Sequence, residues 1–372
     1  MIHHGPRKPF SRILSSSPDI PEGDSLTPPS PRVTVAGLMS QPAIVQRVTV
    51  LGDGGWGTCL AILLAGKGIP VVLWGAFPEY VRQVSASRQN PKFLPGITLP
   101  DAIHLTADLD RALAASPILV VAIPSPYLRK TLARVQAPGG SLIVSVVKGL
   151  EPHTLLRMSE VIGQAWGRDD VVVLSGPSIA YEVARGVPTT VVAASPDGDR
   201  AARVQQLFSA DRFRVYRSAD VIGVELGGAL KNIIAIAAGI ADGLGFGANT
   251  KSALLARGLA EMARLGVAMG ARRETFAGVS GVGDLATTCF SPHSRNRRLG
   301  EAIAQGKTLK DVQASTEQVA EGAVAVQSAV ALARKHGVEM PITEEVCRVL
   351  YEGKTPQQAV RDLMLRDPKP ED

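Results

Sequence analysis

The chain of 372 residues has little cysteine, few aromatic residues and no long run of Lys and Arg. Its three cysteines are Cys59, Cys289 and Cys347, which lie far apart in the sequence. An odd number of dispersed cysteines argues against a disulfide framework and against a zinc cluster. The six histidines are also dispersed, and none forms a metal-spaced pair with a cysteine, so we expect no metal site. This pattern favours a reducing compartment, and we expect a cytoplasmic protein.

Charge and hydrophobicity are both moderate. Lys and Arg exceed Asp and Glu by 6, and a mild excess of this kind suits anionic small molecules at least as well as nucleic acid. The longest apolar stretch, at residues 222–244, contains many glycines and three charged side chains: Glu225, Lys231 and Asp242. Those charges argue against a membrane span, and we expect a buried helix instead.

Three segments of different character follow one another along the chain. Residues 1–45 are rich in Pro and Ser and have no helical or strand period, so we expect a disordered N-terminal extension or a start codon assigned too early. At residues 46–219, apolar β-branched runs alternate with helical segments, which is typical of a parallel sheet covered on both faces. Residues 220–372 have helical patterns throughout.

These segments predict an α/β fold. A Rossmann-like, doubly wound domain at residues 46–219 precedes an all-α domain at 220–372, with the boundary at Ser218–Asp220. The expected strands lie at residues 46–52, 70–75, 118–124, 141–147, 171–176 and 188–195.

A glycine-rich loop follows the first expected strand. Gly52, Gly54 and Gly57 fit the pattern GxGxxG, and a helical stretch and a second strand come next. In this setting Gly52 permits the tight turn, Gly54 lets a pyrophosphate approach the backbone, and Gly57 lets helix and strand pack closely. Free N–H groups at the helix N-terminus favour a phosphate. The loop therefore predicts dinucleotide binding rather than a glycine turn without a ligand.

The end of the second expected strand leaves the choice of cofactor open. An NAD-specific site usually has Asp or Glu there, about 20 residues after the glycine loop. Residues 74–77 read Trp-Gly-Ala-Phe, with no acid before Glu79 and no arginine before Arg82. We expect either NAD or NADP to bind, with a slight preference for NADP.

Two polar positions follow buried strands, where ligands of doubly wound sheets bind. Lys148 comes directly after the strand at 141–147, on the same sheet edge as the glycine loop. A lysine there commonly extends to solvent, but the following glycine favours a functional role. Ser178 follows Gly176 and is either a ligand contact or only the N-cap of the next helix.

Lys231 lies in the middle of the apolar helix. Because a lysine there must lose its hydration, we expect its pKa to fall, which makes it a candidate acid/base. Structural pairing with Glu225 or Asp242 is the alternative. Asp242 is about 16 Å along the helix, too far for direct pairing, so a structural role would require partners from other helices.

A second polar constellation lies at residues 278–298. A glycine-rich turn presents Asp284, and a helix with Ser294 as its plausible N-cap begins with Arg295, Asn296, Arg297 and Arg298. Arginines at a helix N-terminus oppose the helix dipole, a conflict that a bound anion would relieve, so we expect a phosphate site. A solvated basic face would explain Arg297 and Arg298 equally well.

These motifs together resemble those of bacterial-type NAD(P)-dependent glycerol-3-phosphate dehydrogenases. The resemblance runs from about Arg47 to about Asp367 and is carried by GDGGWGTCLA, VVAIPSPYLR, SVVKGLEP, LSGPSIAYEVARGVPT, ELGGALKNIIAIAAGIADGLG, GVSGVGDLATTCFSPHSRNRRLG and VAEG. The chain departs from the family at Gly55, where Ser is frequent, and at Ala76, where a basic residue is common.

The resemblance implies that residues 46–219 form the dinucleotide-binding domain and residues 220–372 the substrate and catalytic domain. It also implies roles for individual residues. Lys231 would be the general acid/base. The other implied substrate-binding residues are Lys148, Gly176, Ser178, Asn232, Asp284, Thr288, Ser294, Arg295 and Asn296. The implied cofactor contacts, beside the loop residues Gly52, Gly54 and Gly57, are Gly55, Trp56, Lys148, Ala180, Arg295, Val319 and Glu321.

The leading hypothesis is reduction of dihydroxyacetone phosphate to sn-glycerol 3-phosphate for phospholipid synthesis, with a possible homodimer formed through the helical domain. A related β-hydroxyacid or ketopantoate-type reductase and a non-catalytic NAD(P)-binding protein are the alternatives. The Ser294–Asn296 segment argues against a carboxylate substrate, and Lys231 and Asp284 argue against a non-catalytic protein.

Overall fold

The computed structural model describes residues 46–315, 320–368 and 370–371. The N-terminal extension that the sequence predicts at residues 1–45 lies outside these described residues, as does Val319.

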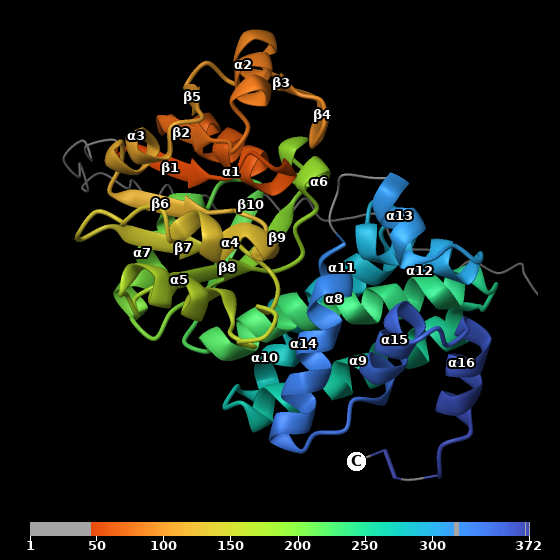
Figure 1. Cartoon of the computed structure of the whole chain (residues 1–372). Helices are drawn as coiled ribbons and strands as arrows, with labels where there is room; N and C mark the ends of the chain where they lie inside the picture. Colours follow the sequence, from red (N-terminus) through yellow and green to blue (C-terminus); the bar gives the residue numbers. More distant parts are fainter. Residues whose placement is uncertain (1–45, 316–319, 369, 372) are drawn as a thin grey trace, which may run out of the picture. The chain divides into compact units, whose positions relative to one another are not determined.

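Within the described residues, one eight-stranded sheet organises the α/β part, in the strand order β10-β9-β8-β7-β6-β1-β2-β5 (Figure 1). Its strands are β1 (Val48–Leu51), β2 (Val71–Trp74), β5 (Ile103–Thr106), β6 (Ile118–Val121), β7 (Leu142–Ser145), β8 (Val172–Ser175), β9 (Thr189–Ala194) and β10 (Phe213–Ser218). A short hairpin of β3 (Gln89–Asn90) and β4 (Leu94–Thr98) stands apart from it. All six expected strands are present.

The sequence patterns missed the β3–β4 hairpin and two strands of the large sheet, β5 and β10, which are its two edges. Their side chains alternate between buried and exposed positions over most of their length, whereas β1, β2, β6, β7 and β8 are buried throughout. A half-exposed edge strand lacks the continuous apolar run that marked the others.

The sheet is parallel except between β8 and β9, which pair antiparallel. The expectation of a wholly parallel sheet is therefore wrong at this one pair. A parallel neighbour requires the chain to return along the full strand, usually in a helix. The segment between β8 and β9 contains only α6 (Ala180–Ala184), about 7 Å long at 1.5 Å per residue, which is too short for that return.

Helices pack on both faces of the sheet. They are α1 (Gly55–Gly66), α2 (Pro78–Ser87), α3 (Leu109–Ala114), α4 (Ser125–Leu132), α5 (Met158–Trp166) and α7 (Gly198–Phe208). Alternate strand residues enter different cores: Val120 packs in the cluster that includes Leu60 of α1, and Leu119 in the cluster that includes Leu128 of α4. The doubly wound arrangement is confirmed.

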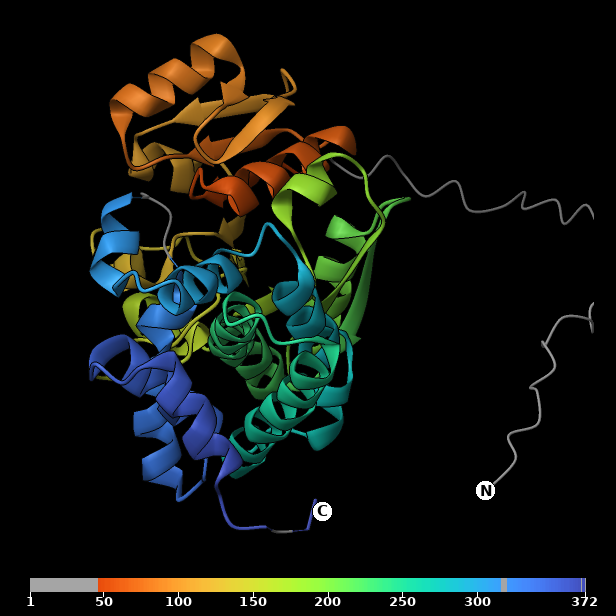
Figure 2. The same ribbon diagram turned by 90° about the vertical axis from the view of Figure 1, so that its right-hand side faces the viewer.

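The chain beyond β10 is helical and is organised around α8 (Val221–Gly243). The other helices are α9 (Ala248–Ala268), α10 (Arg273–Ala277), the π-helical turn η1 (Val279–Gly283), α11 (Asp284–Phe290), α12 (Arg295–Ala304), α13 (Leu309–Ser315), α14 (Glu321–His336), α15 (Pro341–Tyr351) and α16 (Pro356–Met364). Figure 2 shows α8 among these helices. That the two parts divide at residues 218–220 into separate domains stays a prediction.

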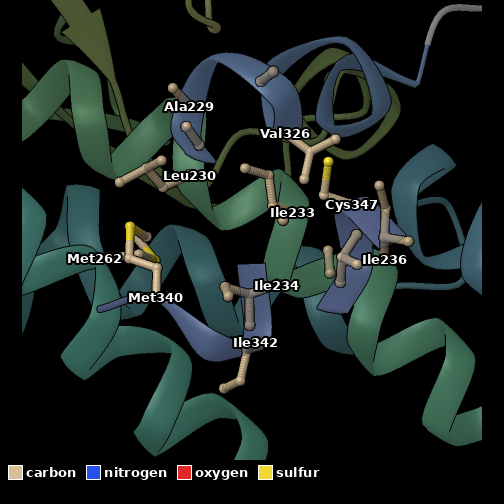
Figure 3. Close-up of a cluster of buried hydrophobic side chains, with 14 of the residues drawn as sticks. Ala229, Leu230, Ile233, Ile234, Ile236, Met262, Val326, Met340, Ile342 and Cys347 are labelled. Carbon is tan, nitrogen blue, oxygen red and sulfur yellow. The ribbon is translucent and has the colours of Figure 1, made fainter. Parts of the chain in front are cut away.

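Helix α8 is long and apolar enough to cross a membrane, but 83% of its most apolar window is buried inside the protein. Ile233, Ile234 and Ile236 of α8 pack against Met262 of α9 and Val326 of α14, in the cluster drawn in Figure 3. The expected buried core helix is confirmed.

Glycines let α8 and α12 approach closely. A Cβ at Gly239 of α8 would overlap the carbonyl oxygen of Arg297, and a Cβ at Gly300 of α12 would overlap that of Ile236. Because the obstructing atoms are backbone, neither contact can be relieved by a side-chain rotation. The close approach fixes the start of α12 beside the middle of α8.

We predict that Gly239→Ala lowers the free energy of unfolding by about 1–3 kcal/mol, because the added methyl group must push the two helices apart. Urea unfolding followed by circular dichroism measures the change. Gly66→Ala, in α1, is the control: no atom of the described residues lies within 4 Å of a Cβ there, and no loss is expected. Equal stability of Gly239→Ala and wild type would contradict this packing.

Candidate active site

The glycine loop between β1 and α1 has the geometry of a pyrophosphate cradle. Gly52 has φ +124°, and a Cβ there would lie 2.6 Å from the carbonyl oxygen of Ala122. A Cβ at Gly57 would overlap the carbonyl oxygen of Gly52, so helix and loop touch. The space around Gly54 is open to 4 Å in the described structure, and no described side chain caps α1. Free N–H groups and a bare backbone thus fit a dinucleotide phosphate.

Asp284 joins the two parts of the chain at the carboxyl edge of the sheet. Its Oδ2 accepts a hydrogen bond of 2.6 Å from Lys148 Nζ, just beyond β7, and its Oδ1 accepts one of 2.5 Å from Lys231 Nζ of α8. Lys148 Nζ also donates to the carbonyl oxygen of Gly176, beyond β8, at 3.1 Å. Lys148 therefore does not extend to solvent: its side chain is only 14% exposed.

Lys231 is buried, as the sequence predicts, and its amine lies against the carboxylate of Asp284. Loss of hydration lowers its pKa to about 8, an effect that Asp284 opposes and the positive charge of Lys148 reinforces. A buried amine with a pKa near neutrality can both give and take a proton at physiological pH. Thr288, one helical turn after Asp284, accepts a second hydrogen bond from Lys231 Nζ at 2.6 Å.

The acidic residues of α8 are engaged elsewhere. Glu225 accepts hydrogen bonds from Arg157 and Ser159 of the α5 region, which ties α8 to the α/β part. Asp242 pairs with Lys251 and Arg297. Lys231 therefore has its partners on α11, which is the source that the sequence left open.

Two asparagines connect α8, α12 and α14. Asn232 Oδ1 accepts from Asn296 Nδ2 at 3.0 Å, and Asn232 Nδ2 donates to Glu321 Oε2 at 3.1 Å. Asn296 Oδ1 accepts from the backbone N–H of Gly322 at 2.9 Å. The network holds the first turn of α12 against α8, one residue from Lys231.

At the start of α12, the expected N-cap is present, but one of the two arginines considered for a solvated basic face is not solvated. Ser294 is the N-cap, and its Oγ accepts from the N–H of Arg297. Arg295 is 43% exposed, with one guanidinium nitrogen 3.7 Å from Glu321. The interpretation of Arg297 as part of a solvated basic face is wrong, because Asp242 and Glu301 both pair with it and its side chain is only 18% exposed. Arg298 is exposed and fits that interpretation.

The comparisons with known proteins agree with this geometry. A family model described as the NAD-dependent glycerol-3-phosphate dehydrogenase N-terminus matches residues 47–201, and the C-terminus model of the same family matches residues 220–361. The chain belongs to the NAD-dependent glycerol-3-phosphate dehydrogenase family. The resemblance seen in the motifs is confirmed.

Relatives of this dehydrogenase family match along nearly their whole length. A glycerol-3-phosphate dehydrogenase (NAD(P)+) of Pelotomaculum thermopropionicum is 51% identical over 86% of this chain and 93% of that protein. The crystal structure of glycerol-3-phosphate dehydrogenase from Coxiella burnetii has a TM-score of 0.83 at 39% identity, and covers 86% of this chain and 99% of that one. The Saccharomyces cerevisiae enzyme has a TM-score of 0.73 at 28% identity.

Three of the remaining positions that the family resemblance singled out, Gly55, Trp56 and Ala180, lie at the glycine loop. Trp56 packs on Phe213, with ring centroids 6.4 Å apart. A Cβ at Gly55, where the dehydrogenase family often has Ser, would lie 2.7 Å from the carbonyl oxygen of Phe93 and 3.8 Å from Cβ of Ala180. Ser178 is not an N-cap: Ile179 holds that position in α6, and Ser178 Oγ donates to the carbonyl oxygen of Gly176.

We predict that Asp284→Asn lowers the free energy of unfolding by about 3 kcal/mol at pH 7, because Lys148 and Lys231 then share no negative charge. The pKa of Lys231 should fall further below its ordinary value of 10.5. The unfolded chain then binds more protons than the folded one, so the deficit should shrink as the pH rises toward about 9. Urea unfolding at both pH values measures this.

Asp211→Asn is the control for this prediction, since Asp211 is exposed and lies outside the lysine cluster. It should unfold like wild type at both pH values. A deficit in Asp284→Asn that does not depend on pH would show that the carboxylate does not neutralise Lys231.

Proposed function

We propose that this dehydrogenase reduces dihydroxyacetone phosphate to sn-glycerol 3-phosphate with NADH or NADPH. The observation that carries the proposal is the buried Lys231 amine, which is held by Asp284 and Thr288 next to Lys148. Relatives that are 51% and 50% identical carry the name glycerol-3-phosphate dehydrogenase (NAD(P)+), which supports the same reaction.

Lys231 is the general acid in this scheme. When the carbonyl carbon of the substrate gains a hydride, negative charge develops on its oxygen, and the Lys231 ammonium group donates a proton to that oxygen. In the oxidation direction, the neutral amine takes the hydroxyl proton instead. The hydride is the chemistry that a bound nicotinamide supplies. A pKa of about 8 keeps both protonation states within reach near neutral pH.

The groups around Lys231 keep this proton transfer aligned. Asp284 and Thr288 hold the amine from one side, which limits its rotation. Lys148 brings a second positive charge to the same carboxylate, and a developing alkoxide nearby is stabilised by that charge. Gly176 and Ser178, beyond β8, contribute backbone and hydroxyl groups to the substrate at this edge.

The start of α12 takes the phosphate of the substrate. Arg295 and the free N–H groups of the first turn supply positive charge, and Ser294 lies at the same helix start. Asn232 and Asn296 place this helix start beside Lys231 through their mutual hydrogen bond. A bound phosphate would draw Arg295 away from its distant partner, Glu321.

The cofactor is held by the glycine loop and the residues that face it. Gly52, Gly54, Gly55 and Gly57 provide the backbone cradle, with Trp56 and Ala180 beside it. Glu321 and Lys148 approach from the substrate side, while Val319 stays a prediction outside the described residues.

A cytoplasmic location and a homodimer through the helical part remain part of the proposal, and the product would enter phospholipid synthesis.

We predict that the rate of reduction falls, and the rate of oxidation rises, as the pH increases through about 8. Reduction requires the charged amine of Lys231, and oxidation requires the neutral one.

Lys231→Ala should lower kcat by about 10²- to 10⁴-fold in both directions while NADH still binds. Steady-state kinetics across the pH range and cofactor titration measure both effects. Full activity in Lys231→Ala would remove the residue from the mechanism.

Arg295 and Arg298 provide a matched pair, because both lie in the first turn of α12. Arg295→Ala should raise KM for dihydroxyacetone phosphate by about 10- to 100-fold, the value of one charge-assisted hydrogen bond. Arg298→Ala should leave KM nearly unchanged. If the protein instead reduces 2-ketoacids faster than dihydroxyacetone phosphate, and Arg295→Ala does not alter that, the ketopantoate-type alternative is correct.

A further inference from the structure

Asp53 lies between Gly52 and Gly54 in the glycine loop and has no place in the scheme above. Its side chain is buried, with a relative exposure of 9% for the residue. Its Oδ2 is shielded from solvent and has no hydrogen-bond partner among the described residues. A buried carboxylate oxygen without a donor is costly, and such an atom usually signals a partner that is still to arrive.

The carboxylate is held in place by the loop around it. The carbonyl oxygen of Asp53 accepts hydrogen bonds from Thr58 Oγ1 at 3.0 Å and from Asn90 Nδ2 at 2.8 Å. Thr58 and Asn90 also bond to each other, at 2.8 Å. The backbone at Asp53 is therefore fixed to α1 and to the β3–β4 hairpin, so the orphaned oxygen is not a product of a loose loop.

The carboxylate of Asp53 occupies the space at the end of β2. A Cβ at Gly75, the residue directly after β2, would overlap Oδ2 and come within 2.6 Å of Cγ. In NAD-specific Rossmann sites, an acid at the end of β2 accepts a hydrogen bond from the 2′-hydroxyl group of the adenosine ribose. Here the strand end has glycine, and an acid from the neighbouring loop fills its position.

The surrounding charges do not favour a second phosphate. Residues 75–77 carry no positive charge, and Arg82 is paired with Glu79. Burial raises the pKa of Asp53, whereas its own backbone N–H and the nearby Lys92 oppose this effect. Lys92 is the cation that a 2′-phosphate would need, but its amine lies over the rings of Tyr80 and Phe93, at 5.8 and 5.3 Å from their centroids.

We propose that Asp53 accepts a hydrogen bond from a hydroxyl group of the adenosine ribose and thereby selects NAD(H) over NADP(H). The proposal rests on the cofactor site of the proposed function. A 2′-phosphate would remove the donor and bring a second anion against the carboxylate. The acid that is absent from the end of β2 is thus supplied by the glycine loop. The proposed preference for NAD(H) is opposite to the slight preference for NADP that the end of β2 alone led us to expect.

Calorimetric titration of the full chain with NADH and with NADPH tests this contact without relying on turnover. Wild type should bind NADH at least about 10-fold more tightly than NADPH. Asp53→Ala should weaken NADH binding by about 10- to 100-fold, the value of a hydrogen bond to a charged group, and leave NADPH binding unchanged or stronger. Asp53→Asn keeps the shape without the charge and should bring the two affinities together.

Asp101→Ala, an exposed acid in the same part of the chain, is the control and should keep the wild-type ratio. A wild-type preference for NADPH, lost in Lys92→Met, would overturn the proposal and assign Lys92 to a 2′-phosphate. The proposal would also be overturned if both Asp53 variants fold and keep the wild-type ratio of NADH affinity to NADPH affinity.

The kinetic arm separates this contact from the proposed function. If wild type prefers NADH through Asp53 but does not reduce dihydroxyacetone phosphate with either cofactor, the proposed reaction fails and the ribose contact is supported. If dihydroxyacetone phosphate is reduced equally with both cofactors in wild type and in Asp53→Asn, the reaction is supported and the contact fails.

Discussion

The structure depends on one carboxylate shared by two lysines. Asp284 accepts from Lys148, which follows a strand of the sheet, and from Lys231, which lies in the core helix of the helical part. Two amines that are largely removed from water need a negative charge nearby. A single Asp can serve both only if the end of β7, the core helix α8 and the turn between η1 and α11 meet at one place. The requirement to pair these charges therefore fixes the position of Lys231, the proposed acid/base, relative to the sheet edge where the cofactor is expected.

Helix packing determines the other half of the site. Backbone contacts at Gly239 and Gly300 bring α12 against α8, and the bond between Asn232 and Asn296 sets the rotation of its first turn. The anion site proposed at the start of α12 would serve the reaction only at a fixed distance from the proposed proton donor, Lys231. Small residues and buried amides provide that distance here, whereas Arg297, also in the first turn, serves the structure through Asp242.

The sequence predicted most of the architecture and the burial of Lys231, the central residue of the candidate site, for identifiable reasons. Six strands were continuous apolar runs, and Lys231 stood out because a charge in an apolar helix is rare. The antiparallel β8–β9 pair was missed because only the length of the returning segment reveals it. The partners of Lys231 could not be predicted, because Asp284 and Thr288 follow it by 53 and 57 positions in the sequence. Hydrogen bonds between such distant residues leave no periodic signal. Asp53 did leave a signal, an acid inside a glycine loop, but its meaning required the position of Gly75.

A crystal structure of the ternary complex with NAD+ and sn-glycerol 3-phosphate tests the central claim most directly. The account predicts that the hydroxyl oxygen to be oxidised lies about 3 Å from Lys231 Nζ, within hydrogen-bond reach, while Asp284 still binds both lysines. A substrate whose reacting oxygen is held by another group, with Lys231 bonded only to Asp284 and Thr288, would contradict it.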